Sequence, residues 1–325
     1  MKVGIFAQSD SWYAKDLQRA AQDRFEIHML DFARLQTTLR SPAVRPTSPT
    51  APHVDLDVNT ICAGEISLHD FDICLIRTMP PGSLEQVVFR MDLLAQLATA
   101  GVTVINPPRS IEVAVDKYLT SQRLANAGLP IPATWVGHDA EAALLAFEQL
   151  GEDVVVKPLF GGEGRGIARI NDRDLAYRAF RWLERHDEVI YLQAFVEHPG
   201  YDIRVFWLGS EPLAMKRINP FDWRTNVSRG ATTEPHELTT PERELAWAAH
   251  QAVGAELSGV DLLPSKNGSV SILEVNAVPG WKRLAKTLQR DIAADVLRYA
   301  ATRHQAAMNS SSAHELRLTP RELTT

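Results

Sequence analysis

The sequence predicts a mixed α/β protein whose N-terminal part is an open parallel sheet with helices on its faces. Apolar runs typical of short buried strands alternate there with helical patterns, and glycine or proline residues separate several of them. The strand runs lie at 3–7, 25–30, 71–76 and 102–105, and the helical runs lie at 17–24 and 83–100. Alternation in this order is typical of a parallel sheet.

The helical run at 83–100 carries end signals that support the assignment. Ser83 is a suitable N-cap, and Glu85 lies in the first turn, where a negative charge is favourable. Gly101 ends the helix before the next strand. The segment 40–53 contains several prolines among serines and threonines, which predicts a mobile loop. No glycine-rich dinucleotide fingerprint follows the first strand, which argues against nicotinamide binding.

Composition excludes several classes of protein. A length of 325 residues with 45% hydrophobic residues allows two or three domains with buried cores. The formal net charge of -6 argues against broad nucleic-acid binding. Cys62 and Cys74 lack the spacing of a zinc site or a disulfide framework. The sequence shows no secretory signal and no apolar run long enough to span a membrane. We therefore expect a cytoplasmic protein with no nucleic-acid or membrane partner.

Prolines and glycines predict the boundaries of the remaining segments. Pro107 and Pro108 follow the last strand of the N-terminal part, so we expect a first domain at 1–106. One helix is expected from about 111 to 127, ended by Gly128. Strands and helices then alternate to about residue 304. The polar segment 306–325 is expected to be a disordered tail.

Two acidic residues and an amide are predicted to converge on one side of a hairpin. Asn267-Gly268 lies between two runs rich in strand-forming residues, and this dipeptide favours a two-residue turn. Pairing outward from that turn places Asp261 opposite Glu274, with both side chains on one face. Asn276 lies two residues beyond Glu274 and points the same way.

A bound cation would remove the repulsion between these carboxylates. Oxygen ligands of this kind suit Mg²⁺ or Mn²⁺, which keep water and phosphate oxygens as their other ligands. Asp261, Glu274 and Asn276 are therefore candidate metal ligands. The alternative is a solvent-facing hairpin with two acidic residues.

A glycine-rich loop and two lysines predict contacts with phosphate. Residues 154–158, VVVKP, form an apolar strand that contains Lys157, and the loop 161–166, GGEGRG, follows it. Backbone N–H groups of such a loop, including those of Gly162 and Gly164, can bind phosphate oxygens. A lysine on an apolar strand needs an anionic partner. Lys117, on the preceding helix, is a second candidate. A flexible hairpin loop and a surface lysine are the alternatives.

Two further segments complete the candidate site. The apolar run 190–196, IYLQAFV, is either a plain core strand or a strand whose backbone binds adenine beside Phe195. Charged and amide side chains gather in the next stretch, where arginine recognises phosphate or carboxylate bidentately. They are Asp202, Arg204, Lys216, Arg217, Arg224, Asn226 and Arg229. A solvated basic face is the usual alternative.

The order of these motifs resembles that of the ATP-grasp superfamily, and more closely that of its RimK-like glutamate ligases. The resemblance covers about residues 70–304. It is carried by DK (116–117), AGLPIPATW (127–135), VVVKPLFGGEGRGI (154–167), YLQAFVEHPGYDIRVFWLG (191–209), WRTNVSRGA (223–231), GVDLL (259–263) and LEVNAVPG (273–280). It implies an N-terminal domain followed by a two-subdomain ATP-grasp fold, with a central subdomain at 107–188 and a C-terminal subdomain at 189–305.

The resemblance also implies roles for individual residues. Lys117 and Lys157 match the lysines that bind nucleotide phosphates. The adenine hinge falls on 193–196, that is Gln193, Ala194, Phe195 and Val196. Asp202, Arg224 and Asn226 match nucleotide or phosphate contacts. The metal ligands are Asp261, Glu274 and Asn276, in agreement with the hairpin argument, and two Mg²⁺ or Mn²⁺ ions are expected.

Two segments depart from the family pattern. Gly280-Trp281-Lys282-Arg283 is more cationic than the corresponding segment of RimK, which argues against a ribosomal-protein substrate. The segment 77–83, RTMPPGS, is similar to ligases that add glutamate to pterin-type cofactors such as tetrahydromethanopterin.

We therefore predict a ligase that uses ATP to convert a carboxylate into an acyl phosphate and joins it to an amine such as glutamate. Arg229, with Arg204 or Arg217, would stabilise the developing negative charge. The carboxylate donor would be a small molecule or a peptide, and the resemblance suggests a homo-oligomer. The alternatives are a non-catalytic ATP-binding regulatory module and a nucleic-acid-binding protein, which the charge argues against.

Overall fold

A computed structural model describes residues 1–39, 60–161 and 165–318. The segment 40–53 and the glycines Gly162 and Gly164 lie outside the described residues, so the predictions for them stay predictions. The chain divides into two compact units. Met1–Pro108 groups with Asp291–Thr325, and Arg109–Arg290 forms the second unit. No described helix is both long enough and apolar enough to cross a membrane.

The first unit is built on a parallel four-stranded sheet of order β2-β1-β6-β7. Its strands and main helices are β1 (Lys2–Phe6), α1 (Trp12–Ala21), β2 (Glu26–Leu30), β6 (Ile73–Ile76), α2 (Leu84–Thr99) and β7 (Thr103–Ile105). A small antiparallel sheet is formed by β3 (Leu35–Thr37), β4 (Ile61–Ala63) and β5 (Ile66–Ser67). The predicted cap is present, because Ser83 and Gln86 form a reciprocal capping box at the start of α2.

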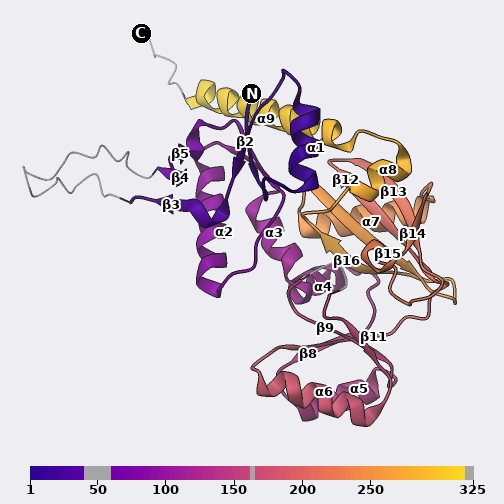
Figure 1. Cartoon of the computed structure of the whole chain (residues 1–325). Coiled ribbons are helices and arrows are strands. Elements are labelled where there is room, and N and C mark those ends of the chain that lie inside the picture. The colour runs from indigo at the N-terminus through magenta and orange to yellow at the C-terminus, as the bar shows by residue number, and fades with distance from the viewer. Residues whose placement is uncertain (40–59, 162–164, 319–325) are drawn as a thin grey trace, which may run out of the picture. The chain divides into compact units, whose positions relative to one another are not determined.

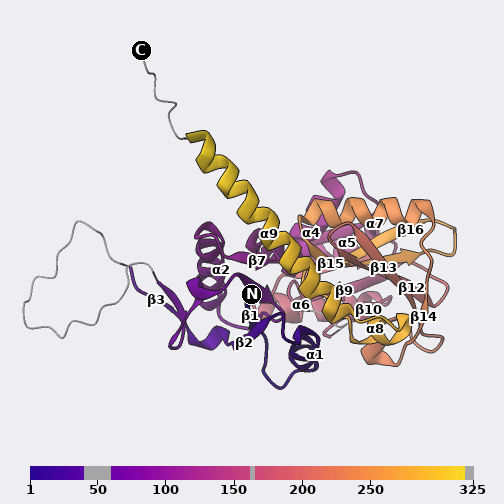
Figure 2. The ribbon, with the colours of Figure 1, turned by 90° about the horizontal axis from the view of Figure 1, so that it is seen from above.

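The C-terminal segment differs from the expectation. Helix α9 (Ile292–Leu318) continues well into the stretch for which we expected a disordered tail (Figure 2). Its N-terminal half packs in the first unit, against α1, β6 and β7. Ile292, Val296 and Leu297 are buried there. The apolar spacing of these residues explains why this part of the helix belongs with the N-terminal sheet rather than with residues 189–290.

The second unit contains two antiparallel sheets, and the first has the order β10-β9-β11-β8. Helices α5 and α6 lie on one face of it and enclose an apolar core (Figure 1). Its elements are β8 (Thr134–Gly137), α5 (Ala140–Gln149), β9 (Val154–Lys157), β10 (Ala168–Ile170), α6 (Arg173–Arg185) and β11 (Ile190–Ala194).

The helix predicted at 111–127 is two helices, α3 (Pro108–Val115) and α4 (Lys117–Asn126). The break lies at Asp116, whose backbone is extended and whose carboxylate accepts a hydrogen bond from Leu119 N at 3.0 Å. An N-cap side chain of this kind competes with helix continuation. The prediction missed the break because helical periodicity continues through it.

The second sheet has five strands in the order β14-β13-β12-β15-β16. Helix α7 packs against β15 and β16 (Figure 2). The elements are β12 (Tyr201–Leu208), β13 (Glu211–Ile218), β14 (Thr232–Pro235), α7 (Thr240–Val253), β15 (Leu257–Pro264), β16 (Val270–Asn276) and α8 (Lys282–Leu288).

The β15–β16 hairpin has the predicted pairing for a reason that the sequence analysis did not anticipate. Asp261 lies opposite Glu274, but Leu262 pairs with Ile272, so a bulge separates the two pairs. The turn is longer than the expected two residues, because Ser265 N donates to Ser269 O at 2.7 Å. Gly268 takes a left-handed φ of 90° in that turn. The longer turn moves the register of the two strands by one residue. The bulge moves it back, so that Asp261 again lies opposite Glu274.

A buried histidine fixes α7 to the second sheet. The His250 ring stacks on Trp207 and Trp247, with centroids 5.7 and 5.2 Å away. Its Nδ1 lies 2.8 Å from Ser258 Oγ. Burial lowers the pKa of His250 to about 4.

Replacing Leu297 should destabilise the first unit, because its side chain is only 1% exposed. We expect Leu297→Ala to lower the free energy of unfolding by about 2–5 kcal/mol. Leu84, which is 79% exposed in the same unit, provides the matched control. Leu84→Ala should change the free energy of unfolding by about 0.5 kcal/mol or less. Urea unfolding followed by circular dichroism measures both, and equal effects would contradict the packing of α9.

Acid should destabilise the second unit through His250. In the unfolded state His250 binds a proton below about pH 6.5. In the folded state it binds that proton only near pH 4, because its pKa is lowered. Stability should therefore fall as the pH falls through this window, by on the order of 3 kcal/mol at most. The measurement is urea unfolding between pH 7.5 and pH 4. The pH dependence of the free energy of unfolding should be smaller in His250→Phe. An unchanged pH dependence in that variant would show that His250 is not responsible.

Candidate active site

A cleft in the second unit is lined by residues from both of its sheets and from α3 and α4. It encloses about 1070 Å³, a volume that includes solvent at its mouth. Most of the residues singled out in the sequence line it. They are Lys117, Lys157, Gln193, Ala194, Phe195, Val196, Asp202, Arg217, Arg224, Asn226, Asp261 and Glu274.

Lys157 is held in place by its neighbour on β11. Its Nζ donates to Gln193 Oε1 at 2.5 Å, and Gln193 Nε2 donates to Thr134 Oγ1 at 3.2 Å. Burial lowers the pKa of Lys157 to about 8, with Glu274 opposing the change and Lys117 adding to it. A partly desolvated ammonium group of this kind is well suited to bind an anion.

Lys117 approaches the same region from the start of α4. Its Nζ donates to the carbonyl of Gly161 at 2.7 Å, which ties α4 to the start of the glycine-rich loop. Burial lowers the pKa of Lys117, and the negative charges of Glu274 and Asp116 oppose the change. Lys117, Lys157 and Glu274 are therefore close enough to interact electrostatically.

The backbone just beyond β11 is only partly hydrogen-bonded within the protein. Ala194 N donates to Ala133 O at 2.8 Å, and Phe195 N donates to Asp153 O at 2.9 Å. Within the described residues, the N–H of Val196 makes no hydrogen bond. The guanidinium of Arg169 covers the Phe195 ring at 3.5 Å from its centroid. The role of Val196 in an adenine hinge stays a prediction.

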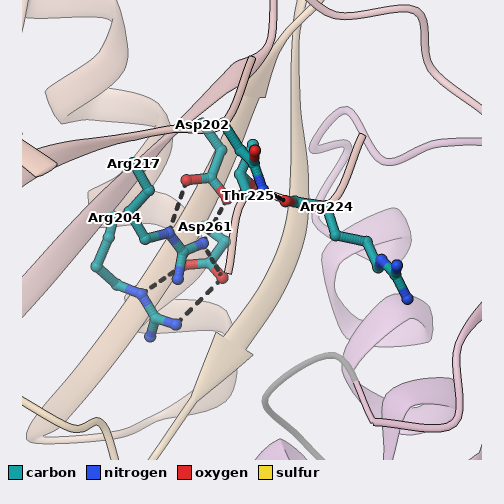
Figure 3. Close-up of polar contacts among 7 residues, drawn as sticks. Asp202, Arg204, Arg217, Arg224, Thr225 and Asp261 are labelled. Carbon is teal, nitrogen blue, oxygen red and sulfur yellow. Dashed lines mark hydrogen bonds and ion pairs between the residues drawn. The ribbon is translucent and has the colours of Figure 1, made fainter. Parts of the chain in front are cut away.

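A buried cluster of two carboxylates and two guanidinium groups lies on adjacent strands of the five-stranded sheet (Figure 3). Arg217 donates to both oxygens of Asp202, with Nε at 2.7 Å from Oδ1. Its Nη2 also donates to Asp261 Oδ2 at 2.8 Å. Asp202 accepts a further hydrogen bond from Thr225 Oγ1 at 2.6 Å.

Charge balance explains how this cluster tolerates burial. Burial disfavours the charge on Arg217, but Asp202 and Asp261 outweigh that effect and raise the pKa of the guanidinium. Burial raises the pKa of Asp202, while Arg217 and the Thr225 hydroxyl act against the rise. Because arginine stays protonated in proteins, Arg217 presents a positive charge to both carboxylates.

Arg204 neutralises Asp261 from the other side. Its Nε lies 2.6 Å from Asp261 Oδ1, and its Nη2 donates to Oδ2 at 3.2 Å. Gly259 makes room for this contact, because a Cβ at that position would lie 2.2 Å from Arg204 Nη1. The sequence analysis overlooked Gly259, although a glycine inside a strand is a signal for close approach of another group.

The predicted metal ligands have a suitable chemical character. Asp261 pairs with Glu274, and Gly259 pairs with Asn276, on adjacent strands. The Glu274 carboxylate makes no hydrogen bond or ion pair within the described residues. Asn276 Oδ1 accepts from Val278 N at 2.7 Å. The described chain contains no group of three His, Cys, Asp or Glu residues placed to hold an ion. Two carboxylates and an amide oxygen fit Mg²⁺, which takes its other ligands from water and phosphates.

The loop between β13 and β14 carries the remaining predicted residues. Asn219 organises this loop, because its Nδ2 donates to the Arg224 carbonyl at 2.9 Å and its Oδ1 accepts from Asp222 N at 3.2 Å. Arg224 forms an ion pair with Asp222 at 2.6 Å, and its side chain points away from the buried cluster (Figure 3). Arg229 is exposed and does not line the cleft. Asn219 and Thr225 were not singled out from the sequence, although Asn219-Pro220 is a turn signal.

Comparison with known proteins agrees with this geometry. Residues 114–300 match the RimK-like ATP-grasp domain. The chain belongs to the RimK-like ATP-grasp family. The family and fold predicted from the sequence are therefore confirmed.

Curated relatives of this chain are ligases. The chain is 31% identical over 312 residues to the tetrahydromethanopterin:alpha-L-glutamate ligase of Methanosarcina acetivorans, covering 86% of this chain and 93% of the relative. It is also 31% identical over 206 residues to the alpha-aminoadipate–LysW ligase LysX of Saccharolobus solfataricus, covering 62% of this chain and 75% of the relative.

The fold is also similar to that of the ATP-grasp ligase PsnB, solved in complex with a minimal precursor, Mg and ADP. The TM-score is 0.68 with 17% identity, and the match covers 94% of this chain and 98% of that one. At this identity, the likeness supports the fold alone.

Removing the Lys157 ammonium group should weaken ATP binding. We expect Lys157→Ala to raise the Kd for ATP about 10- to 100-fold, because a charge-assisted hydrogen bond is lost. Lys266, an exposed lysine paired with Glu197, is the control, and Lys266→Ala should bind normally. Wild-type affinity should also decline above about pH 8, where Lys157 loses its proton. Calorimetric titration between pH 7 and pH 9 tests both expectations, and equal affinities for the two variants would contradict them.

Proposed function

We propose that this protein is an ATP-dependent carboxylate–amine ligase that adds glutamate to a pterin-type cofactor through an acyl phosphate. The observation that carries the proposal is the arrangement of Glu274 beside two half-buried lysines in the cleft that also contains Asp261. Phosphoryl transfer from ATP requires cations that bind the phosphates. It also requires oxygen ligands that hold a hard metal ion.

The proposed nucleotide site extends from β11 to the lysines. Adenine would bind at the Val196 N–H beside the Phe195 ring, which Arg169 already covers. Lys117 and Lys157 would hold the phosphates, with Gly162 and Gly164 contributing backbone N–H groups. Asp261, Glu274 and Asn276 would hold Mg²⁺ or Mn²⁺. The bound ions would neutralise the phosphate charge during transfer.

The substrate carboxylate is proposed to bind near the loop between β13 and β14. In the part of the chain that the structure describes, the Arg229 side chain makes no hydrogen bond or ion pair, and it is exposed. It does not line the cleft, and stabilising the acyl phosphate is proposed for it from the sequence. Arg224 and Asn226 line the cleft and are proposed to contact phosphate. Attack by the amine would then release phosphate and form the amide.

The pterin-type substrate is favoured over an acidic peptide by the extent of the similarity. The match to the tetrahydromethanopterin ligase spans 86% of this chain, whereas the match to the LysW ligase spans 62%. The similarity to the first relative therefore includes more of the region outside the ATP-grasp domain. The predicted cytoplasmic location and homo-oligomeric state remain predictions.

The test is phosphate release from ATP and Mg²⁺ in the presence of a panel of carboxylates, with and without glutamate. The panel contains reduced pterin cofactors and acidic peptides. We expect release to require a pterin donor and glutamate together, and to fall at least about 100-fold in Glu274→Ala. Glu244, an exposed glutamate on α7, is the control, and Glu244→Ala should retain activity.

Other outcomes would change the proposal in defined ways. Turnover with an acidic peptide but with no pterin would overturn the substrate class and keep the ligase. Tight ATP binding without turnover for any donor and amine would favour the regulatory module instead. Full activity in Glu274→Ala would contradict the assigned metal ligand.

A further inference from the structure

A continuous chain of hydrogen bonds links the loop between β13 and β14 to the candidate metal ligand Asp261. The chain runs from Thr225 Oγ1 to Asp202, from Asp202 to Arg217, and from Arg217 to Asp261 (Figure 3). The four residues are 6%, 1%, 5% and 4% exposed, so water competes little for these hydrogen bonds.

Asp202 and Arg217 are held in place by contacts within the protein. Both oxygens of Asp202 accept from Arg217, and Oδ2 also accepts from Thr225. Nε and Nη2 of Arg217 are both engaged with carboxylates. The sequence suggested a nucleotide contact for Asp202 and a catalytic role for Arg217. Their contacts within the protein are better explained by an indirect role.

Arg217 Nη2 is the shared element of the chain. It donates to Oδ2 of Asp202 and to Oδ2 of Asp261. The Thr225 hydroxyl donates to the same Asp202 oxygen. This second donor weakens the hydrogen bond between that oxygen and Arg217 Nη2. Without the hydroxyl, Asp202 would attract Nη2 more strongly, and the contact between Arg217 and Asp261 would weaken. Arg204 would then be the main partner of Asp261. A carboxylate whose orientation is not fixed is a poorer metal ligand.

We propose that Thr225 and Asp202 are positioning residues that fix Arg217 and, through it, orient Asp261 for the metal ion. This inference rests on the proposed function, because it assumes that Asp261 is a metal ligand. Thr225 lies between Arg224 and Asn226, which both line the cleft. Phosphate contacts of Arg224 and Asn226 would in this way be linked to the orientation of Asp261.

Thr225→Val tests the chain, because valine has a similar shape but no hydroxyl. Thr225→Ser is the conservative variant that keeps the hydroxyl. Ser258→Ala is the matched control, since Ser258 is a buried residue of β15 whose hydroxyl contacts His250 and does not belong to the chain. Mn²⁺ affinity in the presence of ADP, measured by electron paramagnetic resonance, needs no turnover. Thermal unfolding of each variant separates positioning from loss of stability.

We expect Thr225→Val to weaken Mn²⁺ binding roughly 10-fold. Thr225→Ser and Ser258→Ala should stay within about twofold of the wild type, because both leave the hydroxyl contact of the chain in place. Arg217→Lys should weaken binding at least as much as Thr225→Val, because lysine cannot bridge two carboxylates in this geometry. It also provides a second test if Thr225→Val does not fold.

Equal Mn²⁺ affinities in the wild type and in the two variants Thr225→Val and Arg217→Lys would overturn the inference. An equal loss in Thr225→Val and Thr225→Ser would also overturn it, because the hydroxyl would not be the cause. A protein that shows the expected differences in Mn²⁺ affinity but no ligase activity would contradict the proposed function and leave the positioning role intact.

Discussion

The buried guanidinium of Arg217 between Asp202 and Asp261 is the interaction on which the site depends. Two carboxylates on adjacent strands would repel each other in a low dielectric, and one fixed cation holds both in place. Arg204 adds a second cation, so the cluster contains two charges of each sign. Removing one member would leave an uncompensated buried charge, which destabilises a protein far more than an exposed ion pair does.

The rest of the site is arranged around this cluster. Glu274 is the acidic group with the largest effect on the pKa of Lys117 and of Lys157, and Asp261 also acts on Lys157. Both lysines are half-buried and have lowered pKa values, so an anionic ligand would stabilise their charged forms. A nucleotide phosphate chain with its metal ion would meet cations on one side and oxygen ligands on the other. The second unit therefore already contains complementary charges for its proposed ligand.

Local patterns predicted much of this arrangement, because they report on single strands, caps and turns. Alternating apolar runs identified the parallel sheet, and the motif order identified the family. The pairing of Asp261 with Glu274 was predicted correctly, although a longer turn and a bulge produce it. The contacts of Arg204 and Arg217 with Asp261 could not be predicted, because they join strands distant in sequence. The contact of Arg217 with Asp202 was missed, although the two residues are paired across a hairpin. The position of α9 was also missed, since its apolar face does not indicate which sheet it covers.

The central claim is that the γ-phosphoryl group of ATP passes to a carboxylate of the donor before the amide forms. The most direct test uses a donor whose reacting carboxylate carries ¹⁸O and follows the label by mass spectrometry of the released phosphate. An acyl phosphate predicts that the phosphate carries oxygen from the donor, because the C–O bond of the activated carboxylate breaks when the amine attacks. Unlabelled phosphate, released while amide accumulates, would contradict the account.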